Sequence, residues 1–297
     1  MNTKYLTTLK TIIEAGSFQK AAILLNYTQS TITFHVQQLE QEMGIKLFEK
    51  IGRRMVLTDA GNAVIPHMET ILQATEQIND YGKDIAEMGG TLRIAMPDIL
   101  LIYEMQPILK AFREYAPNVQ LIIKSLTCYS IREDVIAGGV DVGIHCDIGG
   151  YPDSVRNEKL AEYPVCLVAS PKIDPDTRDF ITAHQRKNVN LISCDPNSVY
   201  QKRFMDYLTD KDIVLNGYME MWSIEAAKRS VISNLGITYL PIFTIDEELK
   251  RGDVIPIKTD LDNTMVEVVC TYHKNKWISA PMELFIRLLK EQFESQR

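Results

Sequence analysis

The chain has 297 residues, of which 45% are hydrophobic and 24% charged, a balance typical of a folded protein with two or three compact units. No stretch approaches the roughly 20 apolar residues that a membrane-spanning helix needs, and the first residues do not resemble a signal peptide, so we expect a cytoplasmic protein without a membrane partner. The net charge of −7 argues against a nucleic-acid ligand for the chain as a whole. Residues 1–60, however, carry seven Lys or Arg and five Asp or Glu, so this end of the chain has a small positive excess that suits contact with DNA.

The first sixty residues predict three short helices. The first ends near Gly16, Ser17 caps the second, and Thr28 caps a third that runs to about Met43. Two helices of these lengths joined by a tight turn form the helix-turn-helix pattern, which places its second helix in the major groove of DNA.

The third helix has two distinct faces. Ile32, Val36 and Leu39 recur at helical spacing and predict a buried stripe. The opposite face is polar, as on many solvated helices, but its place after a tight turn favours the reading of base edges. The residues at its N-terminal end are Gln29, Ser30, Thr33 and Phe34.

A hairpin is predicted after Gly44. Two short apolar strands flank Gly52, and Arg53 and Arg54 follow at the tip. Two adjacent guanidinium groups suit phosphates or a narrow minor groove. We therefore expect a wing that contacts DNA.

The segments GSFQKAAILLNYTQSTITFHVQQLEQEMGIKLFEK and GRRMVLTDAG resemble the LysR-type transcriptional regulators. The resemblance covers the whole chain and is densest over residues 1–62, where it implies a winged helix-turn-helix domain. It places the DNA-reading positions on Gln29, Ser30, Thr33 and Phe34 and the wing contacts on Arg53 and Arg54. The position of Phe34 is often basic in the family, and a phenyl ring can only touch a thymine methyl group or a sugar.

A long helix is predicted from Thr58 to about Glu87, before the hinge at Gly89 and Gly90. Its apolar residues follow steps of three and four, the spacing of a helix-helix seam. We expect residues 58–88 to form a linker helix that dimerises, with packing against the body of the same chain as the alternative. The seam residues are Val64, Met68, Ile71, Ile78 and Ile85.

Beyond the hinge, apolar strands alternate with helices, starting with a strand at 92–96 and a helix from Leu100 to Tyr115. This alternation predicts an α/β domain with a parallel sheet that is covered on both faces. The resemblance implies two α/β subdomains like those of periplasmic binding proteins, crossed twice by the chain. We place the first in residues 91–160 and 266–297 and the second in residues 161–265.

Ligands of open α/β sheets bind beyond the carboxyl ends of the strands. A carboxylate at Asp98 departs from the hydroxyl residue that is common in the family, and it would either cap its own helix or repel an anionic effector. The residues expected at the effector cleft are Pro97, Asp98, Ile99, Thr127, Cys128, His145, Cys146, Ser193, Cys194, Met221 and Ser223.

Five cysteines are present without a CxxC pair, which indicates reduced thiols and no cofactor or metal. Cys128, Cys146 and Cys194 all follow strand ends, so a sensor of redox state or of a soft metal stays open as an alternative. His145 and Cys146 are neighbours on a strand and point to opposite faces, which disfavours one shared metal site.

No nucleotide-binding, metalloprotease or hydrolase motif is found, so an enzyme is not expected. A solute-binding protein would fit the body alone but not the head. We expect a transcription regulator whose effector shifts the orientation of the subdomains. Its expected partners are double-stranded DNA at an interrupted palindrome, a small-molecule effector, further copies of itself in a dimer or tetramer, and RNA polymerase.

Overall fold

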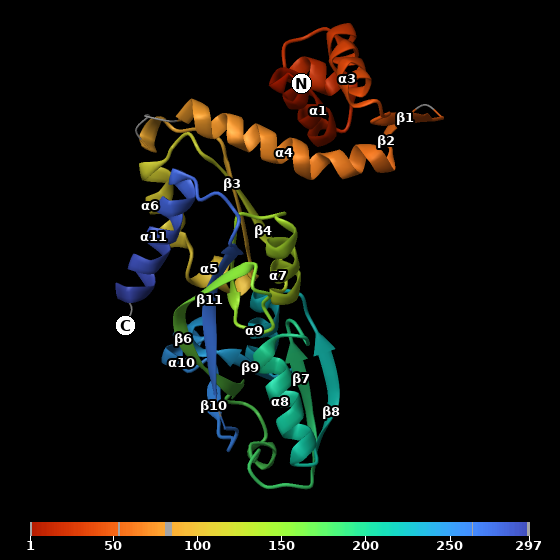
Figure 1. The fold of residues 1–297 in the computed structure, drawn as a ribbon. Coiled ribbons are helices and arrows are strands. Elements are labelled where there is room, and N and C mark those ends of the chain that lie inside the picture. The colour runs from red at the N-terminus through yellow and green to blue at the C-terminus, as the bar shows by residue number, and fades with distance from the viewer. Residues whose placement is uncertain (1, 53, 81–84, 263, 296–297) are drawn as a thin grey trace. The chain divides into compact units, whose positions relative to one another are not determined.

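The computed structural model describes residues 2–52, 54–80, 85–262 and 264–295 and divides the chain into two compact units (Figure 1). The first unit is residues 1–90 and the second is residues 91–297. Within the described ranges, no helix is long and apolar enough to cross a membrane.

The first unit is a helical head with a two-stranded wing, as predicted. The side chains of Ser17 and Thr28 accept hydrogen bonds from the first turns of the helices that they cap. Gly16 and Gly44 end their helices with φ of +66° and +68°, a conformation that strains other residues. The elements are α1 (Thr3–Ala15), α2 (Phe18–Leu24), α3 (Gln29–Met43), β1 (Phe48–Ile51), β2 (Arg54–Leu57), α4 (Asp59–Asp80) and the 3-10 helix η1 (Ile85–Glu87).

The core of the head is formed by one apolar stripe from each helix. In α3 the predicted stripe of Ile32, Val36 and Leu39 is buried. The start of α4 packs on the same core, because Gly61 lies against the carbonyl of Leu47, where a Cβ would clash. The buried residues are Leu6, Leu9, Ile12, Ala21, Ala22, Ile32, Val36, Leu39, Leu47, Phe48 and Met68.

The apolar stripe of the linker helix α4 packs partly on the core of its own head, whereas the sequence predicted contact with a partner helix. Met68 is 2% exposed within the core of its own head, so its assignment to a dimer seam is wrong. Val64 and Ile71 are partly buried against the same core. Ile78 is 76% exposed and remains available to a partner, whereas Ile85 lies in η1 and not in α4.

The second unit contains one mixed sheet with the strand order β4-β3-β5-β11-β6-β9-β7-β8, and β10 pairs with β6. The strands are β3 (Thr91–Met96), β4 (Gln120–Ser125), β5 (Val142–Cys146), β6 (Val155–Ala169), β7 (Gln185–Ser193), β8 (Ile213–Glu220), β9 (Ile237–Pro241), β10 (Ile255–Ile257) and β11 (Met265–His273). The helices are α5 (Asp98–Tyr103), α6 (Gln106–Tyr115), α7 (Cys128–Ala137), α8 (Val199–Asp210), α9 (Ile224–Ile232), α10 (Asp246–Arg251) and α11 (Ala280–Ser295), with 3-10 helices η2 (Pro175–Thr177) and η3 (Ile242–Thr244).

The long strand β6 joins two halves of this sheet. Residues 155–164 of β6 pair with β11, which also pairs with β5, and residues 165–169 pair with β9. We call the strands β3, β4 and β5 with helices α5, α6, α7 and α11 the first half. The second half is the strands β7, β8, β9 and β10 with helices α8, α9 and α10. Each half is parallel at its outer strands, as the alternation predicts, but β6 and β11 run antiparallel to their neighbours, which the alternation did not predict.

Aromatic pairs hold helices onto both halves. In the first half, the rings of Phe112 on α6 and Phe285 on α11 meet edge-on with centroids 5.7 Å apart. In the second half, Phe204 on α8 stacks on Tyr239 of β9 at 4.8 Å. All four side chains are largely or fully buried, so each half has its own aromatic core.

One helix prediction also needs correction. The helix expected from Leu100 to Tyr115 is two helices, α5 and α6, separated at Glu104 and Met105. Pro107 lies in the first turn of α6. Proline lacks an N–H group and clashes inside a continuous helix but is tolerated in a first turn.

Candidate functional site

The head presents the N-terminal end of α3 to solvent. Gln29, Ser30, Thr33 and Phe34 are all exposed, as predicted from the sequence. Phe34 is 50% exposed and touches Tyr5 of α1 edge-on, with ring centroids 6.4 Å apart. This end of α3 therefore has three side chains that can form hydrogen bonds to bases and one phenyl ring that can contact a methyl group.

His35, beside this surface, was not identified from the sequence. Its ring is buried, lies 4.6 Å from the ring of Tyr5, and places Nδ1 2.8 Å from the hydroxyl of Thr8 on α1. Burial, with a smaller contribution from Lys4, lowers the pKa of His35. The position of His35 three residues after Ile32 on the buried stripe is the signal that could have identified it.

The chain entering the wing is held to α3 by hydrogen bonds to the side chain of Glu40. The carboxylate of Glu40 accepts the backbone N–H groups of Leu47 at 2.9 Å and Phe48 at 3.3 Å and also binds Lys46. Burial opposes ionisation of Glu40, but the hydrogen bonds from Lys46 and the backbone lower its pKa. Arg54 is exposed at the start of β2, whereas Arg53 lies outside the described residues.

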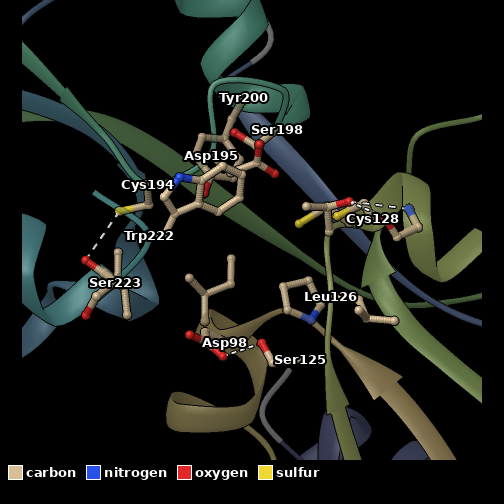
Figure 2. Close-up of a pocket in the computed structure, with 16 residues that line it drawn as sticks. Asp98, Ser125, Leu126, Cys128, Cys194, Asp195, Ser198, Tyr200, Trp222 and Ser223 are labelled. Atoms are coloured by element: carbon tan, nitrogen blue, oxygen red, sulfur yellow. Dashed lines mark hydrogen bonds between the residues drawn. The ribbon is translucent and has the colours of Figure 1, made fainter. Parts of the chain in front are cut away.

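The second unit contains a cavity of about 370 Å³ at the carboxyl ends of strands from both halves (Figure 2). It is lined from the first half by residues at or after the ends of β3, β4 and β5 and from the second half by residues after the ends of β7 and β8. The lining residues are Pro97, Asp98, Ile99, Ser125, Leu126, Thr127, Cys128, Ser130, Cys146, Cys194, Asp195, Ser198, Tyr200, Trp222, Ser223 and Ile224.

Eight of the predicted effector residues line this cavity, and three do not. The eight are Pro97, Asp98, Ile99, Thr127, Cys128, Cys146, Cys194 and Ser223. His145 is fully buried, with its ring nitrogens near the carbonyl of Cys146 at 2.9 Å and the hydroxyl of Thr271 at 3.1 Å. Ser193 is buried within β7, and Met221 accepts a hydrogen bond from Ser230 of α9. Their placement at the cavity is therefore corrected.

The lining residues that sequence reasoning missed lie at the end of β4, in the segments that follow the strands, or in the first turn of a following helix. They are Ser125, Leu126, Ser130, Asp195, Ser198, Tyr200, Trp222 and Ile224. Ser198 immediately precedes α8, and Ile224 is the first residue of α9. Because helix N-termini point into such clefts, the first turn of each following helix was the available signal.

The charge of the cavity comes from two carboxylates. Asp98 accepts a hydrogen bond from Ser125 and does not cap its own helix, and Asp195 accepts the backbone N–H of Asn197 at 2.9 Å. The lining residues that the structure describes include no Lys, Arg or His. Trp222, which is 66% exposed, lines the same cavity (Figure 2). The cavity therefore suits a partly apolar ligand that donates hydrogen bonds or carries positive charge.

Two polar contacts bridge the halves next to the cavity. In one, the Lys202 ammonium on α8 donates to the hydroxyl of Tyr129 on α7 at 3.2 Å. In the other, Lys228 on α9 donates to the hydroxyl of Tyr103 on α5 at 2.8 Å, and that hydroxyl donates to Glu225. Helices of the two halves thus already contact each other at two places.

The three cysteines of the cavity are not arranged as a metal site. Cys128 and Cys194 lie on opposite sides of the cavity (Figure 2). Burial raises the pKa of Cys194 to about 12. Across the part of the chain that the structure describes, no group of three or more His, Cys, Asp or Glu side chains could hold a metal ion.

Comparison with known protein families agrees with this two-unit arrangement. Residues 3–62 match the bacterial regulatory helix-turn-helix protein family of LysR type, and residues 86–294 match the LysR substrate binding domain. The chain belongs to the LysR family. Members of this family are DNA-binding transcriptional regulators with an effector-binding domain, not enzymes.

Two LysR-type relatives match along nearly the whole length. The chain is 36% identical to the transcriptional regulator YfiE of Escherichia coli K12, with 99% of each chain covered. It is 31% identical to the regulator YwqM of Bacillus subtilis 168, covering 99% of this chain and all of the relative.

Solved structures share the fold at low identity. Full-length CbnR in complex with its target DNA superposes with a TM-score of 0.62 at 19% identity, covering 98% of this chain and 100% of that one. Full-length OxyR from Pseudomonas aeruginosa gives a TM-score of 0.69 at 18% identity, covering 99% and 95%. The winged helix-turn-helix head and the α/β effector domain are therefore the established architecture of this chain.

Proposed function

We propose that this LysR-type regulator reads an interrupted palindrome with the N-terminal end of α3 and binds the flanking backbone with its wing. The observation that supports this most is the exposed set Gln29, Ser30, Thr33 and Phe34 on a helix whose opposite face is fully packed. Hydrogen-bonding side chains at the start of a recognition helix read base edges, and Arg54 would neutralise a phosphate.

The proposed effector binds in the cavity between the two halves. A ligand held there changes promoter binding only if it has different affinities for two arrangements of the halves. The contacts Lys202–Tyr129 and Lys228–Tyr103 support such a mechanism, because each must stretch or tighten when α8 or α9 shifts against the first half.

The carboxylates narrow the chemistry of this effector. Asp98 and Asp195 repel an anion, and the cavity lining that the structure describes offers no cationic side chain to compensate. We infer a small, partly apolar molecule that is neutral or positively charged where it meets Asp98.

The proposed assembly is a dimer or tetramer in the cytoplasm that contacts RNA polymerase at the promoter. Support comes from Ile78, a large apolar side chain that is 76% exposed on α4. Symmetric dimers match the two-fold symmetry of a palindrome.

The test is selective binding of DNA by the purified full-length protein. We expect retention of the promoter region beside its own gene at concentrations at least tenfold below those needed for a shuffled fragment of equal length. A double variant with Gln29→Ala and Thr33→Ala serves as the specificity control and should bind both fragments alike. Equal retention of both fragments by the wild type would contradict the proposal.

A further inference from the structure

The second half contains another cavity, of about 220 Å³, which we call the asparagine cavity. Its walls come from the loop around η2, the middle of β7 and β8, and the loop that precedes β9. The lining residues described for it and for the cavity between the halves do not overlap. Six residues that line the asparagine cavity have polar side chains: Asp174, Thr177, Asn188, Asn190, Asn216 and Asn234.

A β-bulge brings three of the lining residues together. The pairing of β7 with β8 shifts by one residue between Lys187 and Asn190. Asn188 and Val189 on β7 therefore oppose Asn216 alone on β8. An extra residue of this kind bends the strand and redirects side chains, and bulges are frequent beside binding sites. Here all three residues of the bulge line the cavity.

Asn190 is held in a fixed orientation beside the bulge. Its amide nitrogen donates a hydrogen bond to the carbonyl of Leu235 at 3.1 Å. Gly217 leaves room for the amide oxygen, since a Cβ there would lie 2.4 Å from Oδ1 of Asn190. Gly236 leaves room for the backbone, since its Cβ would lie 2.4 Å from the carbonyl oxygen of Asn190. Two residues without side chains thus position one polar group before a ligand binds, which lowers the entropic cost of binding.

The wall formed by residues 173–177 is also held in place. Lys187 is 6% exposed, and its ammonium donates to the carbonyl of Thr177 at 3.2 Å and lies 4.7 Å from the centre of the Phe180 ring. Arg178 donates to the carbonyl of Ile173 at 2.9 Å. Because these contacts hold the loop in the structure without a ligand, the cavity does not have to form during binding.

The lining restricts the chemistry of a ligand. None of the ten lining residues that the structure describes carries a positive charge, and the Asp174 carboxylate repels anions. A single exposed carboxylate also holds a cation only weakly. Each asparagine amide both donates and accepts hydrogen bonds, as a hydroxyl group does. A polyol can therefore replace water at these amides without losing hydrogen bonds, and Val189 and Leu235 offer apolar surface to its C–H groups.

We propose that the asparagine cavity is a second small-molecule site, which binds an uncharged polyhydroxy compound, namely a polyol or a monosaccharide. Pockets for drug-sized ligands measure roughly 300 to 1,000 Å³, so this smaller cavity suits a smaller ligand. The inference goes beyond effector binding between the halves. Residues 188–190 of β7 line the asparagine cavity, and Cys194, which follows the same strand, lines the other cavity. Two different molecules can therefore be bound at the same time.

The experiment titrates the full-length protein with xylitol and, separately, with D-glucose, and follows each probe by saturation-transfer NMR. We expect saturable binding of at least one probe, with a Kd in the millimolar range. A double variant with Asn188→Ala and Asn216→Ala should weaken this binding about tenfold, because two neutral hydrogen bonds together contribute about that much. Asn157→Ala is the matched control and should bind as the wild type does, because Asn157 is an exposed asparagine on β6, outside the cavity.

A third substitution keeps the test decisive if the double variant does not fold. Asn234 has a φ of +60°, so Asn234→Gly removes an amide from the cavity without straining the backbone, and it should also weaken binding. Circular dichroism shows whether each variant is folded. If the wild type binds neither probe saturably, the proposal is wrong. Binding that persists unchanged in the folded asparagine variants would place the probe at another site and would equally overturn it.

Discussion

Phe34 is the one apolar side chain among the four that α3 presents at its N-terminal end. Because it is half exposed and its ring contacts are the edge of Tyr5 at 6.4 Å and a tilted contact with His35 at 6.3 Å, replacing it should cost little folding free energy. We expect Phe34→Ala to change the stability by no more than about 0.5 kcal/mol. The preference for operator over random DNA should fall by about 1 kcal/mol, the usual cost of one poorly read base pair.

This prediction is checked by thermal melting and by competition binding on the same preparations. Ile23→Ala is the matched control, because Ile23 is a similarly exposed apolar residue on α2, outside the proposed reading surface. A large drop in melting temperature with unchanged operator preference would show that Phe34 is a packing residue.

His35 makes the stability of the head depend on pH. Its folded-state pKa lies below the ordinary value of 6.5 because the ring is buried and Lys4 is near. Its contribution to stability is therefore complete above pH 6.5 and is lost as the pH falls through the folded-state pKa. His35→Gln keeps a hydrogen-bonding group near Thr8 and does not titrate.

We expect the melting temperature of the wild type to fall more than that of His35→Gln when the pH is lowered from 7.5 to 5. Other titrating groups are the same in both proteins and cancel in this comparison. Parallel melting curves over the whole range would rule out this contribution of His35.

Residue-level prediction from the sequence succeeded where one physical rule decided the outcome. Cys128 and Cys146 were found because they follow strand ends. The prediction that His145 lines the cavity is wrong because adjacent side chains on a strand point to opposite faces. Since Cys146 faces the cavity, its neighbour His145 must face away from it. Tyr200 was missed because it lies in the first turn of α8, seven residues beyond the end of β7, where a rule restricted to strand ends does not reach.

At the scale of elements, the wing should act through charge. Arg54→Ala should weaken binding to operator and random DNA alike. It should also reduce the slope of log affinity against log salt by about 0.9. Binding titrations at several salt concentrations measure this, with exposed Lys20 on α2 replaced as the control. Loss of affinity with an unchanged slope would point to damage of the hairpin.

The helix α4 should show two different roles along its length. Met68→Ala should destabilise the head by about 2 to 5 kcal/mol, because Met68 is buried in its core.

Ile78→Asp should leave the stability of the head unchanged and yield a smaller species in sedimentation. Ile78 is exposed on α4, so a carboxylate at this position would put a charge into the partner interface. If Ile78→Asp keeps the mass of the wild type, dimerisation uses another surface.

The sequence pattern predicted most elements but not their connections. The caps Ser17 and Thr28 are local signals and gave correct helix starts. Pro107 is the sequence signal for the interruption of the helix after Asp98, because proline is not tolerated inside a continuous helix. The spacing of apolar residues alone does not detect this interruption. The continuity of β6 depends on partners far away in the chain, which periodicity cannot show.

At the scale of the whole molecule, the division at residue 90 should appear in calorimetry. Two compact units with separate cores should unfold in two transitions. Operator DNA binds the folded head and should raise the transition of residues 1–90 by mass action. A single transition with or without DNA would show that the two units unfold as one.

The position of β11 also determines the order in which the newly made chain can fold. In the sheet, β11 lies between β5 and β6, yet it comes after all the other strands of this sheet in the sequence and is therefore made after them. The second half, with β7 to β10, is complete before β11 exists, so it is expected to fold first. Until then the first half carries two unpaired strand edges, which are sites of aggregation. Translation that stops before Met265 should therefore yield an insoluble product, although the DNA-reading head has already been made.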